Sequence, residues 1–224
     1  MFKKSAIYIA VIFSFSIPLL SVFAFTALTE VVATPYDIVT INEPEIEKLV
    51  LGELLDAPEM FEIVSEDPFT FSVEIRALPD RQSSGLMPPQ FSGIIIKQNE
   101  IRGVTEIARL KSSDSKWNEV RDKVTGLAYL AGPAFTEQLE PGTYRIEIST
   151  PDNTGKYMLL FGAKPDKVGY FETLSNIKNV YNYYGLGGIS MFSSPYIHYP
   201  IGIVVLIILI SGTWFWQRKH KIYV

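Results

Sequence analysis

The chain has 224 residues and contains no cysteine. This absence excludes disulfides, thiolate nucleophiles, and zinc or iron–sulfur sites built on cysteine. None of the asparagines begins an Asn-x-Ser/Thr sequence, so the chain carries no signal for N-glycosylation. Both absences favour a bacterial or archaeal cell envelope over a eukaryotic secretory route.

Histidine is scarce, and the two present, His198 and His220, lie near the C-terminal end. Histidine is the commonest general base in enzymes. The sequence also lacks the Gly-x-Ser-x-Gly, Walker and His-Glu-x-x-His motifs. A glycosidase pair or a calcium site could still use carboxylates, namely Glu43, Glu45, Glu47, Glu66, Asp67 and Asp152. We interpret these as solvated charges at strand ends and turns, and predict no catalytic residue, cofactor or metal site.

Basic residues are fewer than acidic ones, at 20 against 24. Five basic residues lie in the terminal flanks, which leaves the segment between the flanks at 15 − 24 = −9. Nucleic acids need their phosphates neutralised by lysine and arginine. We therefore expect no nucleic-acid partner.

The N-terminal segment, residues 1–33, is typical of an export signal. Lys3 and Lys4 precede an apolar run that continues to about residue 28. The sequences Val22-Phe23-Ala24 and Val31-Val32-Ala33 both suit a signal peptidase. Because the run is longer than usual, an uncleaved signal anchor is the alternative.

The C-terminal segment predicts a transmembrane helix over residues 199–217. The anchor is apolar and ends in two tryptophans, which favour the headgroup level; its main residues are Ile201, Val204, Leu206, Ile208, Trp214 and Trp216. A basic tail, residues 218–224, follows directly. Because positive charge stays inside, the topology signals place both chain ends in the cytoplasm; they are Lys3, Lys4, Arg218, Lys219 and Lys221. We predict a cell-membrane protein with its middle outside the cytoplasm, single-pass if the signal is cleaved and otherwise with two spans.

The middle segment, residues 34–166, alternates apolar and polar side chains with period two. In "PFTFSVEIRAL", Phe69, Phe71 and Val73 share one face of an expected strand. About nine such strands are expected, at residues 37–41, 47–55, 59–65, 68–78, 91–98, 104–110, 135–139, 143–149 and 155–162. Many short strands with regular turns predict a mainly β fold, an antiparallel β-sandwich that is jelly-roll-like.

Two stretches of this segment are expected to be loops, 79–90 and 111–126. In the second, Trp117, Val120 and Val124 have spacings of three and four, which predict a short helix or a loop pinned by Trp117. Trp117 is a candidate ligand contact. The interpretation we favour is that its ring covers one end of the sandwich.

Residues 167–198 predict a juxtamembrane helix and a linker. Apolar residues recur there at helical spacing, and glycines stop the pattern at residue 185. An aromatic-rich helix next to a membrane can lie on the bilayer surface, and we slightly favour that arrangement. The alternative is that the helix packs against the sandwich.

The sequence "GTYRIEISTPDNTGKYMLLFG", together with "GELLDAPEMFEIVSEDPFTFSVEI", resembles uncharacterised bacterial membrane-anchored sandwich proteins. It is more loosely similar to the prepeptidase C-terminal and GOLD-like domains, in which a hairpin of this pattern closes the sandwich. The resemblance covers about 110 residues and implies a fold and an accessory or binding role, with no reaction. Asn153 and Gly155 would hold the hairpin turn.

These observations predict a non-catalytic protein with an accessory, binding or sensing role and an unknown protein or glycan as partner. Two alternatives stay open, a structural envelope protein and a carboxylate-dependent glycan hydrolase. A carboxylate pair in a pocket would favour the hydrolase, and a uniformly polar surface would favour the structural protein.

Overall fold

The structure is a computed structural model that describes residues 22–23, 26–29, 37–79, 90–99 and 103–220. The expected signal or anchor helix, with Lys3 and Lys4, lies outside the described residues. Lys221 of the basic tail also lies outside them.

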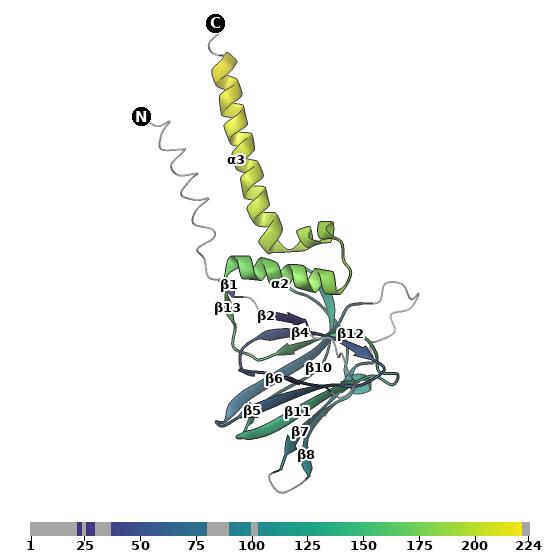
Figure 1. Ribbon diagram of the computed structural model, residues 1–224. Coiled ribbons are helices and arrows are strands. Elements are labelled where there is room, and N and C mark those ends of the chain that lie inside the picture. The colour runs from purple at the N-terminus through teal and green to yellow at the C-terminus, as the bar shows by residue number, and fades with distance from the viewer. Residues whose placement is uncertain (1–21, 24–25, 30–36, 80–89, 100–102, 221–224) are drawn as a thin grey trace.

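The domain is mainly β and has two large sheets dominated by antiparallel pairing (Figure 1). One sheet has six strands in the order β2-β4-β12-β6-β10-β9: Thr26–Thr29, Lys48–Leu55, Thr154–Phe161, Phe69–Ala77, Ala128–Leu139 and Asn118–Arg121. The other has five in the order β3-β5-β11-β7-β8: Ile38–Thr40, Glu59–Ser65, Gly142–Ser149, Ser92–Gln98 and Val104–Leu110. Among the described strands, the pairs β2–β4 and β3–β5 are parallel and the other pairs are antiparallel. A separate two-stranded ribbon joins β1, Val22–Phe23, to β13, Lys167–Val168.

The period-two pattern of the sequence builds one core between the two sheets. Phe71 and Ile75 on β6 lie in the same buried cluster as Tyr144 and Ile146 on β11. Because successive side chains of a strand point to opposite faces, these residues all face the space between the sheets. The strands expected at 59–65 and 104–110 are confirmed with those bounds.

Helix α2, Tyr170–Tyr183, covers the outer face of the six-stranded sheet. A second buried cluster contains Ile177 and Tyr181 of α2 together with Leu49, Leu51 and Met158 of the sheet. The apolar face of this helix is therefore occupied by protein. The alternative, packing against the sheet domain, is confirmed, and contact of the outer side of α2 with a bilayer stays a prediction.

The C-terminal helix α3, Pro195–His220, leaves the domain on the side that carries α2, after a short 3-10 helix, η3, Gly188–Ser193 (Figure 1). The layers follow one another as α3, α2, the six-stranded sheet and the five-stranded sheet, which lies farthest from α3. Within α3, residues Pro195–Trp214 are long and apolar enough to cross a membrane, since 20 residues span ~30 Å.

Strand β2 lies inside residues 1–33, the segment expected to be the signal. It forms an edge of the six-stranded sheet, and the Thr26 hydroxyl donates a hydrogen bond of 2.6 Å to Asp166 Oδ2. Cleavage after Ala33 would remove this edge strand, whereas cleavage after Ala24 would leave it in place.

Candidate functional site

The turn between β9 and β10, residues 122–127, is held in shape by the Asp122 carboxylate and is called the junction turn below. Asp122 Oδ1 accepts hydrogen bonds from the backbone N–H groups of Val124 and Thr125 and from the Thr125 hydroxyl, at 2.9, 2.5 and 2.8 Å. Gly126 follows with φ at 75°, a left-handed conformation that favours glycine. The Asp122 side chain therefore stabilises the conformation of the junction turn.

The junction turn is bonded to α2 and to Ser194, the residue between η3 and α3. The Ser194 hydroxyl donates to the Val124 carbonyl at 2.6 Å, and the Tyr181 hydroxyl donates to the Thr125 carbonyl at 2.9 Å. Ser194 and Thr125 are fully buried. A Cβ on Gly126 would lie 2.2 Å from the Ser193 carbonyl oxygen, so the two backbones are in close contact. The link between η3 and α3 is therefore seated directly on the sheet domain.

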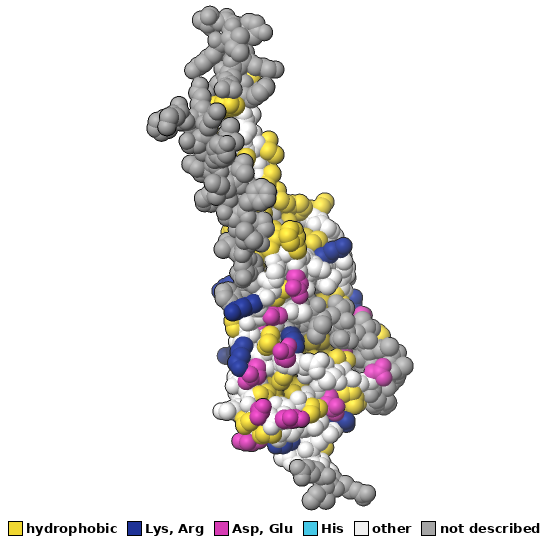
Figure 2. Space-filling view, turned by 60° about the vertical axis from the view of Figure 1, so that its left-hand side comes forward, with side chains coloured by type: hydrophobic (Ala, Val, Ile, Leu, Met, Phe, Trp, Pro, Cys, Tyr) yellow, Lys and Arg dark blue, Asp and Glu magenta, His cyan; other side chains and the backbone are white. Residues whose placement is uncertain are grey.

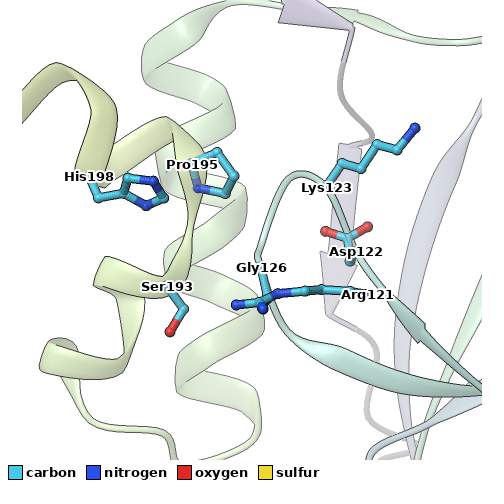
Figure 3. Close-up of a pocket in the computed structure, with 7 residues that line it drawn as sticks. All are labelled: Arg121, Asp122, Lys123, Gly126, Ser193, Pro195 and His198. Carbon is cyan, nitrogen blue, oxygen red and sulfur yellow. The ribbon is translucent and has the colours of Figure 1, made fainter.

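Beside the junction turn lies a pocket of about 480 Å³, called the basal pocket below (Figure 3). It is lined by Arg121, Asp122, Lys123, Gly126, Ser193, Pro195 and His198. Arg121 extends toward the segment that carries Ser193, whereas the Lys123 ammonium group projects away from it. The Arg121 Nε donates to the Gly126 carbonyl at 3.1 Å, which holds the side chain along the turn.

A second pocket, of about 680 Å³, lies at one end of the sheets and is called the hydroxyl pocket below. Six hydroxyl side chains, one amide and one proline line it: Gln90, Ser92, Ser112, Ser113, Ser115, Ser149, Thr150 and Pro151. The backbone N–H of Ser112 donates to Ser92 Oγ at 3.1 Å, which ties the start of β7 to the 3-10 helix η2, Ser112–Asp114. Among the described residues, no charged side chain belongs to this lining.

Trp117 is half-buried at the edge of the core, next to the hydroxyl pocket. Its Nε1 donates to Ser112 Oγ at 3.3 Å, and its ring lies so close to Gly132 that a Cβ there would approach to 2.4 Å. It packs against the core cluster between the sheets, an arrangement that fits a ring covering one end of the core. Its role as a ligand contact stays a prediction. The surrounding stretch differs from expectation, because residues 118–121 form strand β9 and Val120 is exposed while Val124 is buried.

Two of the candidate carboxylates, Glu45 and Asp152, accept hydrogen bonds from nearby residues. Glu45 accepts a hydrogen bond from the Thr70 backbone N–H at 2.9 Å, and its bond from Lys164 lowers the pKa of its carboxyl. Hydrogen bonds from Thr154 and Thr150 lower the pKa of Asp152 in the same way. Within the described residues, no group of three histidine, aspartate or glutamate side chains could hold a metal ion.

A buried carboxylate that the sequence analysis missed lies inside the core. Glu59 is fully buried and accepts a hydrogen bond from the Tyr157 hydroxyl. Burial, reinforced by this carboxylate, raises the pKa of Tyr157 well above its usual value. The sequence could have predicted this burial, because Glu59 lies on the same face of its strand as Phe61 and Ile63, which point into the core. Glu59 lines neither pocket.

The expected anchor residues all lie on α3, and their side chains are exposed: Ile201, Val204, Leu206, Ile208, Trp214 and Trp216. Arg218 and Lys219 lie in its last turn. The helix thus presents an apolar surface that nothing in the described chain covers.

No family model and no curated protein matches the chain. Among solved structures, it is similar to the pre-peptidase C-terminal domain of a collagenase from Bacillus anthracis, with a TM-score of 0.34 and 11% identity. The match covers 58% of this chain and 96% of that domain. It supports a loose similarity between two β-domains.

Proposed function

We propose that this protein is a membrane-anchored, jelly-roll-like β-sandwich whose domain lies outside the cytoplasm and binds a neutral glycan without catalysing a reaction. The apolar helix α3 would be the anchor, with its basic end inside, and residues 1–21 would be part of a signal or a second anchor. The joint between Ser194 and Val124 would present the domain at a constant orientation to the membrane.

The hydroxyl pocket carries the binding role. A hydroxyl group both donates and accepts hydrogen bonds, and a lining of six hydroxyls without charge matches a ligand that is itself rich in neutral hydroxyls. The half-buried indole of Trp117 is bonded to this lining through Ser112, and its exposed edge would be the part that could contact a sugar ring. These features together favour a glycan over a charged peptide.

The arrangement of carboxylates favours binding over hydrolysis. Glycoside hydrolysis uses two carboxyl groups on either side of the bond that is cleaved. Among the described residues, the basal pocket holds one carboxylate, Asp122, whose Oδ1 already accepts three hydrogen bonds, and the hydroxyl pocket holds none.

The test is binding of the full-length protein, in mild detergent, to a panel of neutral glycans. The substitution Ser113→Tyr places a ring in the pocket lining and should abolish binding. The matched control, Thr105→Tyr, puts the same ring on exposed strand β8 and should leave binding intact. If the wild-type protein binds no glycan, the glycan function is refuted, and if both variants bind as it does, the hydroxyl pocket is refuted as the binding site.

A protein partner is the second candidate, and one observation favours it. The outer face of the five-stranded sheet, farthest from α3, is not uniformly polar. It carries half-buried Met60, Ile94 and Ile96 beside the ion pair of Arg145 with Glu62, at 2.9 Å. Affinity purification with mass spectrometry should recover a stoichiometric partner that Ile94→Glu releases and Leu55→Glu, an exposed site on β4, does not. Recovery of no partner would remove this candidate.

A further inference from the structure

The basal pocket lies at the root of α3. Its lining combines the junction turn with Ser193, Pro195 and His198, which belong to the end of η3 and the first turn of α3. The apolar run of α3 begins at Ile201, and residues 195–200 rise by ~9 Å at 1.5 Å per residue. This rise exceeds the ~5–7 Å depth of one headgroup layer. The candidate span itself begins at Pro195, so the pocket lies where the span ends and the headgroup layer begins.

The surface around this root is apolar. Ile189 and Phe192 of η3 are 88% and 51% exposed, and Phe171 at the start of α2 is 74% exposed. Figure 2 shows apolar side chains continuing from α3 onto the adjoining end of the domain, while basic and acidic side chains are interspersed farther down. A bilayer that receives α3 would meet η3 at its surface, so the basal pocket would open at the level of the headgroups.

The charge of the basal pocket differs from that of the acidic domain around it. Arg121 and Lys123 are exposed, and neither forms an ion pair in the described part of the chain. The one acidic liner, Asp122, directs its Oδ1 to donors of the junction turn. Arginine matches phosphate geometry because its planar guanidinium donates two parallel hydrogen bonds.

We propose that the basal pocket binds the phosphate group of an anionic phospholipid from the leaflet that α3 enters. Arg121 donates to the phosphate oxygens, and Ser193 supplies a hydroxyl on the opposite wall. Lys123, whose ammonium group projects away from Ser193, adds positive charge only at the rim. This site rests on the membrane anchoring proposed above. Through the junction turn, a bound headgroup would hold the sheet domain at the membrane surface.

The experiment uses the full-length protein in nanodiscs that contain phosphatidylcholine and phosphatidylglycerol in equal parts. Native mass spectrometry then counts the lipids that stay bound on release. The wild type should retain phosphatidylglycerol preferentially. The double variant R121Q/K123Q should bind it about 25-fold more weakly, since each basic residue near an anionic surface contributes about fivefold.

The control variant R109Q/K111Q removes the same charges from β8 and the adjoining residue, in exposed ion pairs far from α3, and it should behave as the wild type. Equal loss in both variants would overturn the site in favour of general charge attraction. Equal retention by R121Q/K123Q and the wild type would also overturn it. A second arm adds inorganic phosphate, and displacement of the lipid at equal concentration would mean that free phosphate is the ligand. If the anchoring itself were wrong, the protein would be absent from the nanodisc fraction.

Discussion

Replacing Gly126 with alanine should separate α3 from the sheet domain while leaving both sheets folded. The added Cβ would lie 2.2 Å from the carbonyl oxygen and 2.6 Å from the carbonyl carbon of Ser193. Ordinary contacts of a Cβ are at ~3.5–4.0 Å, and both neighbours are backbone atoms that cannot rotate away. The junction turn and η3 must therefore move apart by more than 1 Å, roughly the gap between these distances.

The magnitude of the effect follows from what this movement breaks. An alanine in the left-handed region costs about 1–2 kcal/mol. The buried hydrogen bonds from Ser194 to Val124 and from Tyr181 to Thr125 would also be lost, at about 1 kcal/mol each. Gly126→Ala should therefore lower the free energy of unfolding by about 3–4 kcal/mol in total.

Gly185 provides the matched control, because its φ is 65° and nothing lies within 4 Å of a Cβ built there. Gly185→Ala carries the backbone strain alone, so its Tm should lie ~4–8 °C above that of Gly126→Ala. Calorimetry of both variants of the full-length protein measures this difference. Hydrogen exchange should rise at Val124, Thr125 and Tyr196 in Gly126→Ala only. Equal Tm values and equal exchange would refute the close contact between the junction turn and η3.

Three further predictions concern the core and the chain start. Tyr157→Phe removes a donor from buried Glu59 and should destabilise the domain by about 1–3 kcal/mol in chemical denaturation, and an unchanged midpoint would contradict the contact. Burial raises the pKa of Tyr129, Tyr157 and Tyr184. The unfolded chain therefore releases these protons first, and stability should be full below pH about 10 and fall as pH rises beyond it. Tyrosinate absorbance of these rings should appear only together with loss of circular dichroism, and ionisation of the folded protein would refute this. The intact mass of the mature protein should correspond to a start before Thr26, because β2 completes the six-stranded sheet; a start at residue 34 would contradict the role of that strand.

The strands and the hairpin turn could be predicted because their causes are local. Asn153 and Gly155 were expected at turn positions, and their φ values are 49° and 112°. Alternation within one strand places Phe71 and Ile75 on the same face whatever the rest of the chain does. Strand β9 was missed because its four residues are exposed and carry no alternation, so the chance spacing of Trp117 and Val120 was read as helical.

The position of α2 illustrates a signal that was present but unused. Within "KLVLGELL" and "YMLLF", apolar residues occur at consecutive positions, as in strands that are buried on both faces. Leu49 and Met158 face outward from the core between the sheets and needed a cover, which the apolar face of α2 provides. The spacing of apolar residues in α2 indicated that the helix packs against an apolar surface. The outward-facing apolar residues of the six-stranded sheet identify that surface.

The two pockets could not be predicted, because each is assembled from distant segments. The basal pocket joins residues 121–126 with 193–198, and the hydroxyl pocket joins three separate segments, 90–92, 112–115 and 149–151. Serine and threonine are common in turns for reasons of local hydrogen bonding. No single stretch of sequence indicates that these distant serine and threonine residues line one cavity.

The strand order also governs when the fold can be completed. Strand β12 pairs with β4 on one side and with β6 on the other, although both precede it by many residues. The six-stranded sheet therefore stays divided until residues 154–161 emerge, with an unpaired edge on each half. Such edges are templates for wrong pairing between chains, and closure of this kind is slow because the contacts are far apart in sequence. Newly made chains should accordingly depend on protection against aggregation until β12 enters, only about 30 residues before α3 begins.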